Sequence, residues 1–256
     1  MLEKQELKEF LDEKYYQFNT PDFIDSDPIQ IPHSFSSKED VEISAFLSAS
    51  IAWGQRKIII KNAFRLIEMM DNRPSDFILN AEESDLSVFD SFVHRTFNAE
   101  DCKFFIRSLQ NIYKKHGGLE NVFTKGYSEN GSIESALIYF RKVFLETEHL
   151  VRTEKHVANI LRNSSAKRLN MFLMWMVRND GRGVHFGLWD KINPAHLFLP
   201  LDVHTGNVGR KLGLLSRKQN DWKAVDEITQ SLRSFDPTDP VKYDFSLFGL
   251  GIFDKF

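Results

Sequence analysis

The architecture of this chain is built around the stretch Ser165-Ala-Lys-Arg-Leu-Asn-Met-Phe-Leu-Met-Trp-Met-Val177, which is apolar almost all round. When these residues are placed at the helical period, no polar face remains. A helix that is hydrophobic on every side is buried inside the protein. The run Asp180-Gly-Arg-Gly183 then ends the pattern, because glycine is a poor helix former. The sequence therefore predicts a central helix over residues 165–177.

Amphipathic helical patterns recur on both sides of this central segment. They cover residues 3–18, 37–51, 55–70, 100–116, 119–124, 133–145, 203–212, 222–235 and 243–252. Residues 20–35 contain Pro21, Pro28 and Pro32, which predicts an extended connector. The chain shows no internal repeat, no low-complexity tract and no convincing pair of strands. Helices joined by loops predict an all-α fold.

Composition limits the class of protein. With 256 residues, 42% of them hydrophobic, the chain is long enough for one large domain or two intimate small ones. Its single cysteine, Cys102, excludes an internal disulfide and any four-cysteine zinc or iron–sulfur site. The first residues lack the order of a signal peptide, and no apolar run approaches the roughly 18 residues of a membrane span. We expect a cytoplasmic protein with no membrane partner.

Charge is distributed unevenly along the chain. The formal net charge is only −3. Residues 1–46 contain 4 basic residues (Lys or Arg) and 11 acidic residues (Asp or Glu). Residues 152–223 contain 13 basic and 5 acidic residues. Clustered positive charge is typical of a protein that binds a polyanion such as nucleic acid. The alternative is a dipolar surface without a function.

The stretch Phe198-Leu-Pro-Leu-Asp202-Val-His-Thr-Gly-Asn-Val-Gly-Arg-Lys-Leu-Gly-Leu214 combines an apolar run, one carboxylate and a basic helix. Pro200 fixes the approach to Asp202 at the helix start. The polar side of the helix carries His204, Asn207, Arg210 and Lys211. The basic groups could hold the phosphates of a ligand. The carboxylate could then stabilise a positive charge that develops on that ligand during a reaction. The alternative is that Asp202 only caps the helix, since Asp is among the best N-cap residues.

Lys167 stands at the start of the central helix, 35 residues before Asp202. This separation leaves room for one helix and a return loop, so both helix starts can face the same cleft. The free N–H groups of helix N-termini suit phosphate binding. A neutral lysine placed there can act as a nucleophile. The alternative is an ordinary solvated lysine at a helix end, since most lysines are exposed.

The segment Leu199-Pro200-Leu-Asp202-Val-His204, followed by a helix, resembles the Pro-x-Asp-x-His segment of the helix-hairpin-helix DNA glycosylases. The archaeal 8-oxoguanine glycosylases are the nearest analogue, because they too have an altered hairpin. The resemblance implies two intimate helical subdomains around a central cleft. The residue patterns predict an amino-terminal helix and proline-containing connector over residues 1–36, and the resemblance implies a glycosylase-like helical domain over residues 37–256.

The chain also resembles a bacterial family of uncharacterised proteins over roughly residues 40–252. The shared motifs are Ala52–Arg56, Ala166–Asn170, Trp175–Arg178, Phe186–Trp189 and Asp239–Phe245. This resemblance implies no established activity. We interpret Asp239 and Asp244 in the last motif as turn and helix-start residues, with a contribution to the cleft as the alternative.

The glycosylase resemblance implies excision of a damaged base, an oxidised purine such as 8-oxoguanine, from double-stranded DNA. The base would be flipped out, and Lys167 would attack the sugar C1′ to form a Schiff base that allows β-elimination. Asp202 would stabilise the positive charge on the sugar. Phosphate contacts are assigned to Arg168, His204, Asn207, Arg210 and Lys211. Trp53 and Gln55 would contact the extruded base, while core packing is the alternative for Trp53.

The turn before Lys167 departs from the superfamily. The superfamily hairpin normally reads Leu-Pro-Gly-x-Gly, whereas this chain has Leu161-Arg-Asn-Ser-Ser-Ala166, so the phosphate-binding turn is missing or rebuilt. This favours a second hypothesis, a non-catalytic module that binds DNA or RNA. A third hypothesis is a nucleoside or RNA-modifying hydrolase. The eight histidines form no pair at ligand spacing, so we predict no metal and no cofactor. We expect the protein to act as a monomer.

Overall fold

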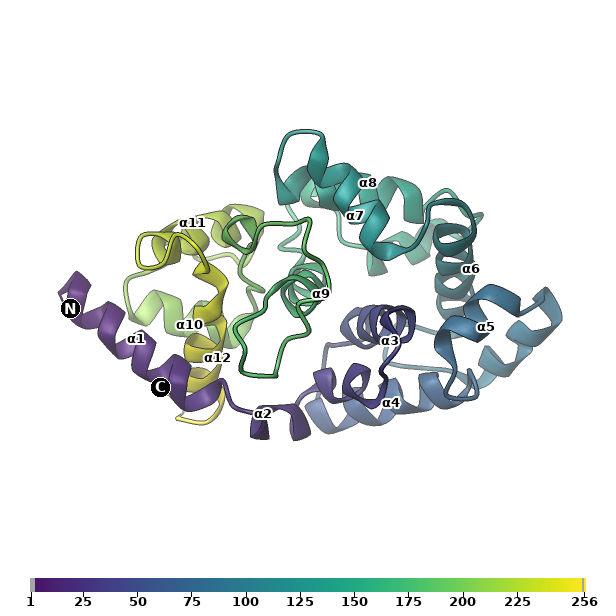
Figure 1. The fold of residues 1–256 in the computed structure, drawn as a ribbon, viewed down its shortest axis with the longest axis horizontal. Coiled ribbons are helices and arrows are strands. Elements are labelled where there is room, and N and C mark those ends of the chain that lie inside the picture. The colour runs from purple at the N-terminus through teal and green to yellow at the C-terminus, as the bar shows by residue number, and fades with distance from the viewer. Residues whose placement is uncertain (1–2, 255) are drawn as a thin grey trace. The chain divides into compact units, whose positions relative to one another are not determined.

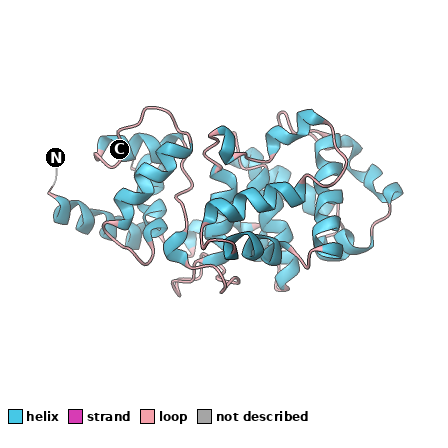
Figure 2. Ribbon diagram, turned by 90° about the horizontal axis from the view of Figure 1, so that it is seen from above, coloured by secondary structure: helices cyan, strands magenta, loops and turns pink. Residues whose placement is uncertain are grey.

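Helices account for 64% of the chain in the computed structural model, which describes residues 3–254 and 256 (Figure 1). These described residues form no β-strand, as Figure 2 shows, which confirms the predicted all-α class. The chain packs into two compact units: unit 1 comprises residues 1–25 and 159–256, and unit 2 comprises residues 26–158. The helix-hairpin-helix arrangement and the division after residue 36 stay predictions.

Unit 1 contains the predicted central helix. Its helices and helical turns are α1 (Lys4–Phe18), α2 (Asp22–Asp25), η5 (Ile160–Arg162), α9 (Lys167–Val177), η6 (Pro194–His196), α10 (Val203–Lys211), α11 (Trp222–Arg233), η7 (Pro240–Tyr243) and α12 (Asp244–Ile252). Every residue of α9 from Leu169 to Val177 is buried. The helix begins at Lys167 instead of Ser165, because Ala166 adopts the left-handed conformation with a φ of 48°.

Unit 2 is built around a second buried helix. Its elements are η1 (Pro28–Gln30), η2 (Pro32–Ser34), α3 (Lys38–Ser50), α4 (Arg56–Glu68), α5 (Pro74–Asn80), η3 (Glu83–Ser91), α6 (Ala99–Lys115), α7 (Leu119–Ser128), α8 (Ile133–Phe144) and η4 (Val151–His156). In α3 every residue from Val41 to Ser50 is buried. Phe46 of α3 lies 5.5 Å, between ring centroids, from Phe140 and from Phe144 of α8. Aromatic packing therefore forms the core of this unit.

The proline-rich segment of residues 20–35 is folded into short helical turns, so the prediction of an extended connector was wrong. The turns are α2, η1 and η2. Pro28 and Pro32 occupy the first positions of η1 and η2. Proline suits that position because its φ is already helical and its missing N–H would have no partner there. Asp27 caps η1 by accepting a hydrogen bond from the Ile29 backbone at 3.0 Å.

The helix α1 packs against α12 within unit 1, and the two lie side by side in Figure 1. Leu7, Leu11 and Tyr15 form the buried face of α1. At Gly249 of α12 the ring of Phe18 comes so close that an added Cβ would lie 2.1 Å from it. Only glycine therefore allows this approach of the two helices.

We expect Gly249→Ala to lower the free energy of unfolding of unit 1 by about 1–3 kcal/mol, because the extra methyl group forces Phe18 out of its site. Gly251→Ala is the comparison in the same helix and should cost less, since its added Cβ would lie 3.1 Å from His204 Cβ, a tight contact that a much smaller shift relieves. Urea unfolding of both variants measures the difference. Equal stability of the two variants would contradict the packing described.

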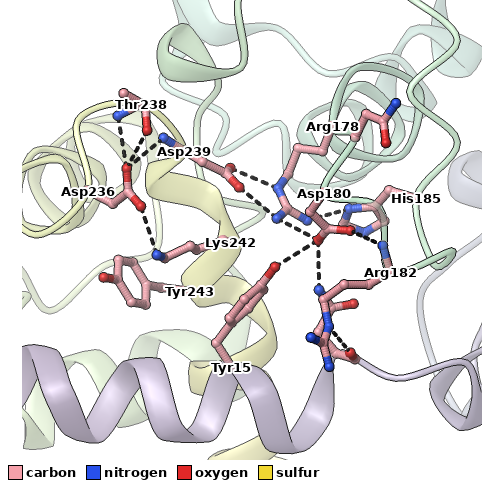
Figure 3. A network of polar contacts seen from close by, with 12 residues as sticks. Tyr15, Arg178, Asp180, Arg182, His185, Asp236, Thr238, Asp239, Lys242 and Tyr243 are labelled. Atoms are coloured by element: carbon pink, nitrogen blue, oxygen red, sulfur yellow. Dashed lines mark hydrogen bonds and ion pairs between the residues drawn. The ribbon is translucent and has the colours of Figure 1, made fainter.

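A polar network centred on Arg178, at the end of α9, joins α1 to the segment before η7 (Figure 3). The Arg178 side chain is only 1% exposed. Its Nε and Nη2 donate to the Asp239 carboxylate at 2.8 and 2.7 Å, and Nη2 also donates to Asp180 at 3.0 Å. The Tyr15 hydroxyl and the Asn19 amide donate to the same Asp180 oxygen at 2.9 and 2.7 Å. Asp239 thus forms an ion pair inside unit 1.

Acid is expected to weaken unit 1 as Asp180 becomes protonated. Burial alone would raise the pKa of Asp180, but the Arg182 backbone hydrogen bond and the charge of Arg178 lower it to about 2. An aspartate in an unfolded chain has a pKa of about 3.9. The stabilisation by Asp180 is therefore complete above about pH 4 and is lost as the pH falls toward about 2.

The variant Asp180→Asn tests this pH dependence. It should be less stable than the wild type at pH 6, and its stability should fall less steeply between about pH 4 and pH 2, because the titrating group is gone. Urea unfolding at a series of pH values provides the measurement. A wild-type slope in the variant would show that other carboxylates control acid unfolding.

Candidate active site

Lys167 is the first residue of α9. The residue before it, Ala166, has no side-chain group that could accept a hydrogen bond from the helix start. Ala166 is the N-cap residue, and its backbone N–H donates to Ser164 Oγ at 3.3 Å. The amide of Asn170 holds the preceding turn by donating to the Ser165 carbonyl at 3.2 Å. The Lys167 side chain is 25% exposed, so the amine is partly enclosed yet open to solvent.

Asp202 has two roles at the start of α10, one for each carboxylate oxygen. Its Oδ1 caps the helix by accepting a hydrogen bond from the Thr205 backbone at 2.9 Å. Its Oδ2 lies 4.0 Å from Lys167 Nζ, with 22% of the side chain exposed. The cap interpretation is therefore correct for one oxygen, while the other faces the lysine. The structure brings Lys167 and Asp202 together, as their positions at two helix starts predict.

The turn before Lys167 is rebuilt without glycine. Asn163 adopts the left-handed conformation with a φ of 61°, a position that glycine usually takes and that asparagine tolerates. Its side-chain amide donates to Asp221 Oδ2 at 2.8 Å, and its carbonyl accepts from the Trp222 backbone at 3.2 Å. Ser164 and Asp221 form an isolated β-bridge. The start of α11 thus holds the turn that leads into α9.

The residues predicted to bind phosphate differ in their surroundings. His204, Asn207 and Lys211 are exposed on α10. Arg168 is half-buried, and burial lowers the pKa of its guanidinium to about 10. Arg210 donates from Nε to the Arg217 carbonyl at 2.8 Å, and from Nη2 to the Lys218 carbonyl at 2.9 Å and to Asn220 Oδ1 at 2.6 Å. These hydrogen bonds direct Arg210 toward the loop of residues 217–220.

Trp53 and Gln55 belong to unit 2, on either side of Gly54. The Trp53 indole stacks on the His156 ring, with 5.8 Å between the ring centroids, and meets the His94 ring edge-on at 4.9 Å. Trp53 is half-buried and Gln55 is exposed. Packing against two histidines accounts for part of the Trp53 surface, and the rest stays accessible.

Asn220 is a residue at this site that the sequence did not reveal. Its side-chain amide donates to the Asp202 carbonyl at 2.9 Å. The residue lies in a loop, where neither helical nor strand periodicity carries information about contacts. The only signal in the sequence is its position just before Asp221, a predictable helix cap.

Among the residues that the structure describes, no group of three or more His, Cys, Asp or Glu side chains is arranged to hold a metal ion. No described helix is both long and apolar enough to cross a membrane.

Comparisons with known proteins indicate a family and no activity. A family model described as "Protein of unknown function (DUF2400)" matches residues 27–253. This confirms the predicted membership of an uncharacterised family. No curated protein gives a significant match, and no solved structure does. Lys167 and Asp202 both lie within the matched range.

Proposed function

The chain belongs to this family, whose description assigns no activity, and from its own residues we propose that it is a DNA base-excision glycosylase. The proposed substrate is double-stranded DNA with an oxidised purine such as 8-oxoguanine. The 4.0 Å separation of Lys167 Nζ and Asp202 Oδ2 carries the proposal. An amine and a carboxylate so close together, both partly exposed, are the groups that Schiff-base glycosylase chemistry requires.

The proposed reaction uses the free-amine form of Lys167, after its ammonium group has lost a proton to solvent, with the Asp202 carboxylate held 4.0 Å from Nζ. Nζ forms a bond to the sugar C1′ while the N-glycosidic bond breaks. The electron pair of that bond leaves with the base, which takes up a proton from solvent, and the newly bonded nitrogen loses one of its protons to solvent. Asp202 stabilises the positive charge that develops on the sugar. The C1′–O4′ bond then breaks, O4′ takes up a proton, and the nitrogen lone pair forms the protonated Schiff base between Nζ and C1′. Loss of a C2′ proton to solvent from this intermediate, with departure of the 3′ phosphate, would nick the strand.

We assign the phosphate contacts to the exposed residues of α10 in the first place. Lys211, His204 and Asn207 present a cation, an imidazole and an amide to solvent from one short helix. Arg168 and Arg210 are retained as weaker candidates, because burial encloses the first and three hydrogen bonds hold the second. Phosphate contacts of this kind produce an affinity that falls as the salt concentration rises.

For recognition of the base, we propose Trp53 and Gln55 of unit 2. The accessible part of the Trp53 ring can stack on a base, because His156 and His94 hold the ring in place. Gln55 is exposed and can donate or accept hydrogen bonds. We further propose that the chain has the helix-hairpin-helix glycosylase fold and acts as a cytoplasmic monomer.

Base release from a panel of duplexes tests the proposal. Each duplex contains one lesion, with 8-oxoguanine first, and the products are separated after treatment with and without hot alkali. We expect release of a damaged base from at least one duplex, and little or none from undamaged DNA, lesion-containing RNA or free 8-oxoguanosine. Release from RNA or from the nucleoside would favour the hydrolase hypothesis instead.

The rebuilt turn favours one alternative function, a non-catalytic module that binds DNA or RNA. Asn163 and Ser164 are held against α11 where the superfamily has a phosphate-binding glycine turn. Such a module would bind duplex DNA with the same salt dependence in the wild type, Lys167→Gln and Asp202→Asn, and would release no base. The glycosylase proposal predicts binding by all three proteins, with base release by the wild type.

A further inference from the structure

One segment, Arg217–Trp222, is hydrogen-bonded both to Asp202, which caps α10, and to the turn that precedes α9. On the side of α10, the Asn220 amide donates to the Asp202 carbonyl at 2.9 Å. Asn220 Oδ1 in turn accepts from Arg210 Nη2 at 2.6 Å. The backbone carbonyls of Arg217 and Lys218 accept two further hydrogen bonds from Arg210. The loop is therefore fixed to both ends of α10.

A glycine in α10 makes this contact possible. An added Cβ at Gly206 would lie 2.8 Å from Asn220 Oδ1 and 2.9 Å from Arg210 Nη1. Gly206 is inside a helix, where glycine costs about 1 kcal/mol relative to alanine. Its presence there is explained by the room that Asn220 needs to reach Asp202.

The other side of the loop holds the turn that leads to Lys167. Asp221 accepts from the Asn163 amide at 2.8 Å, and the Trp222 backbone donates to the Asn163 carbonyl at 3.2 Å. Asp221 is itself fixed by Arg217, whose Nε donates to Oδ1 at 2.6 Å, and by its role as the cap of α11. Hydrogen bonds from Arg217 and the Ala224 backbone keep the pKa of Asp221 far below its usual range, so it remains charged.

We propose that the loop Arg217–Trp222 is a positioning element that sets the distance between Lys167 and Asp202. The two groups lie on different helices, and the same six residues bond to the backbone at Asp202 and to the turn four residues before Lys167. A displacement of about 1 Å between reacting groups can cost roughly 100-fold in rate. The expected effect on the reaction rate rests on the proposed function, but the effect of the loop on the distance between Lys167 and Asp202 can be tested without any substrate.

Carbodiimide cross-linking of the free protein measures this geometry. The reagent condenses an amine and a carboxylate that are already in contact, and mass spectrometry of the digested protein quantifies the Lys167–Asp202 amide. The test variants are Asn220→Ala and Asn163→Gly; the second deletes the amide and keeps a residue suited to a positive φ. The control variant is Gln219→Ala, an exposed neighbour in the same loop. The Lys103–Asp90 ion pair of unit 2, at 2.5 Å, is the internal standard.

We expect the Lys167–Asp202 amide to form in the wild type and in Gln219→Ala, and to fall at least threefold in each test variant relative to the Lys103–Asp90 amide. Thermal unfolding shows which variants are folded. Asn220→Ala removes the contact of the loop with Asp202, and Asn163→Gly removes its contact with the turn before Lys167, so either variant that folds tests the inference. An unchanged yield in a folded test variant, or no amide in the wild type, overturns the inference.

Kinetics separates this inference from the proposed function. If the protein excises a base, both test variants should lower kcat about tenfold and leave KM within twofold of the wild type, since the exposed residues of α10 to which phosphate binding is first assigned are unchanged. A reduced cross-link together with a wild-type protein that releases no base would support the positioning role and refute the glycosylase. A wild-type kcat in variants with a reduced cross-link would overturn the role in positioning for catalysis.

Discussion

Asp202→Asn is expected to lower the rate of base release by about 10²–10⁴-fold without lowering the stability of the protein. The two oxygens of Asp202 do different things: Oδ1 caps α10 through Thr205, while Oδ2 faces the Lys167 amine. Asparagine is as good an N-cap as aspartate, so the helix start survives the change. The negative charge that would stabilise the sugar cation is lost.

A second variant at the same position completes this test. Asp202→Ala removes the cap as well as the charge, and should cost about 1 kcal/mol of stability in addition to the loss of activity. Single-turnover base release and thermal unfolding of both variants give the two quantities independently. If Asp202 were only a cap, Asp202→Asn would keep full activity, and only Asp202→Ala would be impaired.

Arg178→Met is expected to destabilise unit 1 by about 3–5 kcal/mol, the usual cost of removing one partner of a buried ion pair. Arg178 is 1% exposed and donates to the carboxylates of Asp239 and Asp180. Methionine fills a similar space, so the loss reports on charge more than on packing. Without the guanidinium, two carboxylates that are 25% and 14% exposed face each other without their shared cation.

The control for this prediction is Lys8→Ala in α1. Lys8 pairs with Asp12 four residues along the helix, and both side chains are partly exposed, at 34% and 23%. Such a pair contributes only about 0–1 kcal/mol. Urea unfolding followed by hydrogen exchange at the amides of α1 and α9 locates the loss in unit 1. A loss in Arg178→Met no larger than that in Lys8→Ala would show that the network is dispensable.

The sequence was sufficient for the features that follow from periodicity and capping. The apolar run of residues 165–177 predicted a buried helix, and α9 is buried along nearly all its length. Asp202 was recognised as a cap, and the positions of Lys167 and Asp202 at two helix starts predicted that they meet. The buried helix and the cap depend on the local order of residues, which a single sequence shows directly, and the contact between Lys167 and Asp202 was inferred from the length of chain between two helix starts.

Other features could not be predicted because they depend on contacts between distant loops. Asn220 reaches Asp202 only because Gly206 leaves room for it, and no local pattern shows this. Arg210 looked like a phosphate ligand on a basic helix, yet three hydrogen bonds direct it to residues 217–220. The prolines of residues 20–35 were interpreted as breaks in structure, although Pro28 and Pro32 each begin a short helical turn.

Borohydride trapping tests the central claim most directly, because it captures the bond that Lys167 is proposed to form. The wild-type protein is incubated with 8-oxoguanine duplex and the rest of the lesion panel in the presence of sodium borohydride, which reduces a Schiff base to a stable amine. We predict a covalent protein–DNA species whose digested peptide carries the sugar on Lys167, and no such species from Lys167→Gln. Absence of the species on every lesion, or its persistence in Lys167→Gln, would contradict the account.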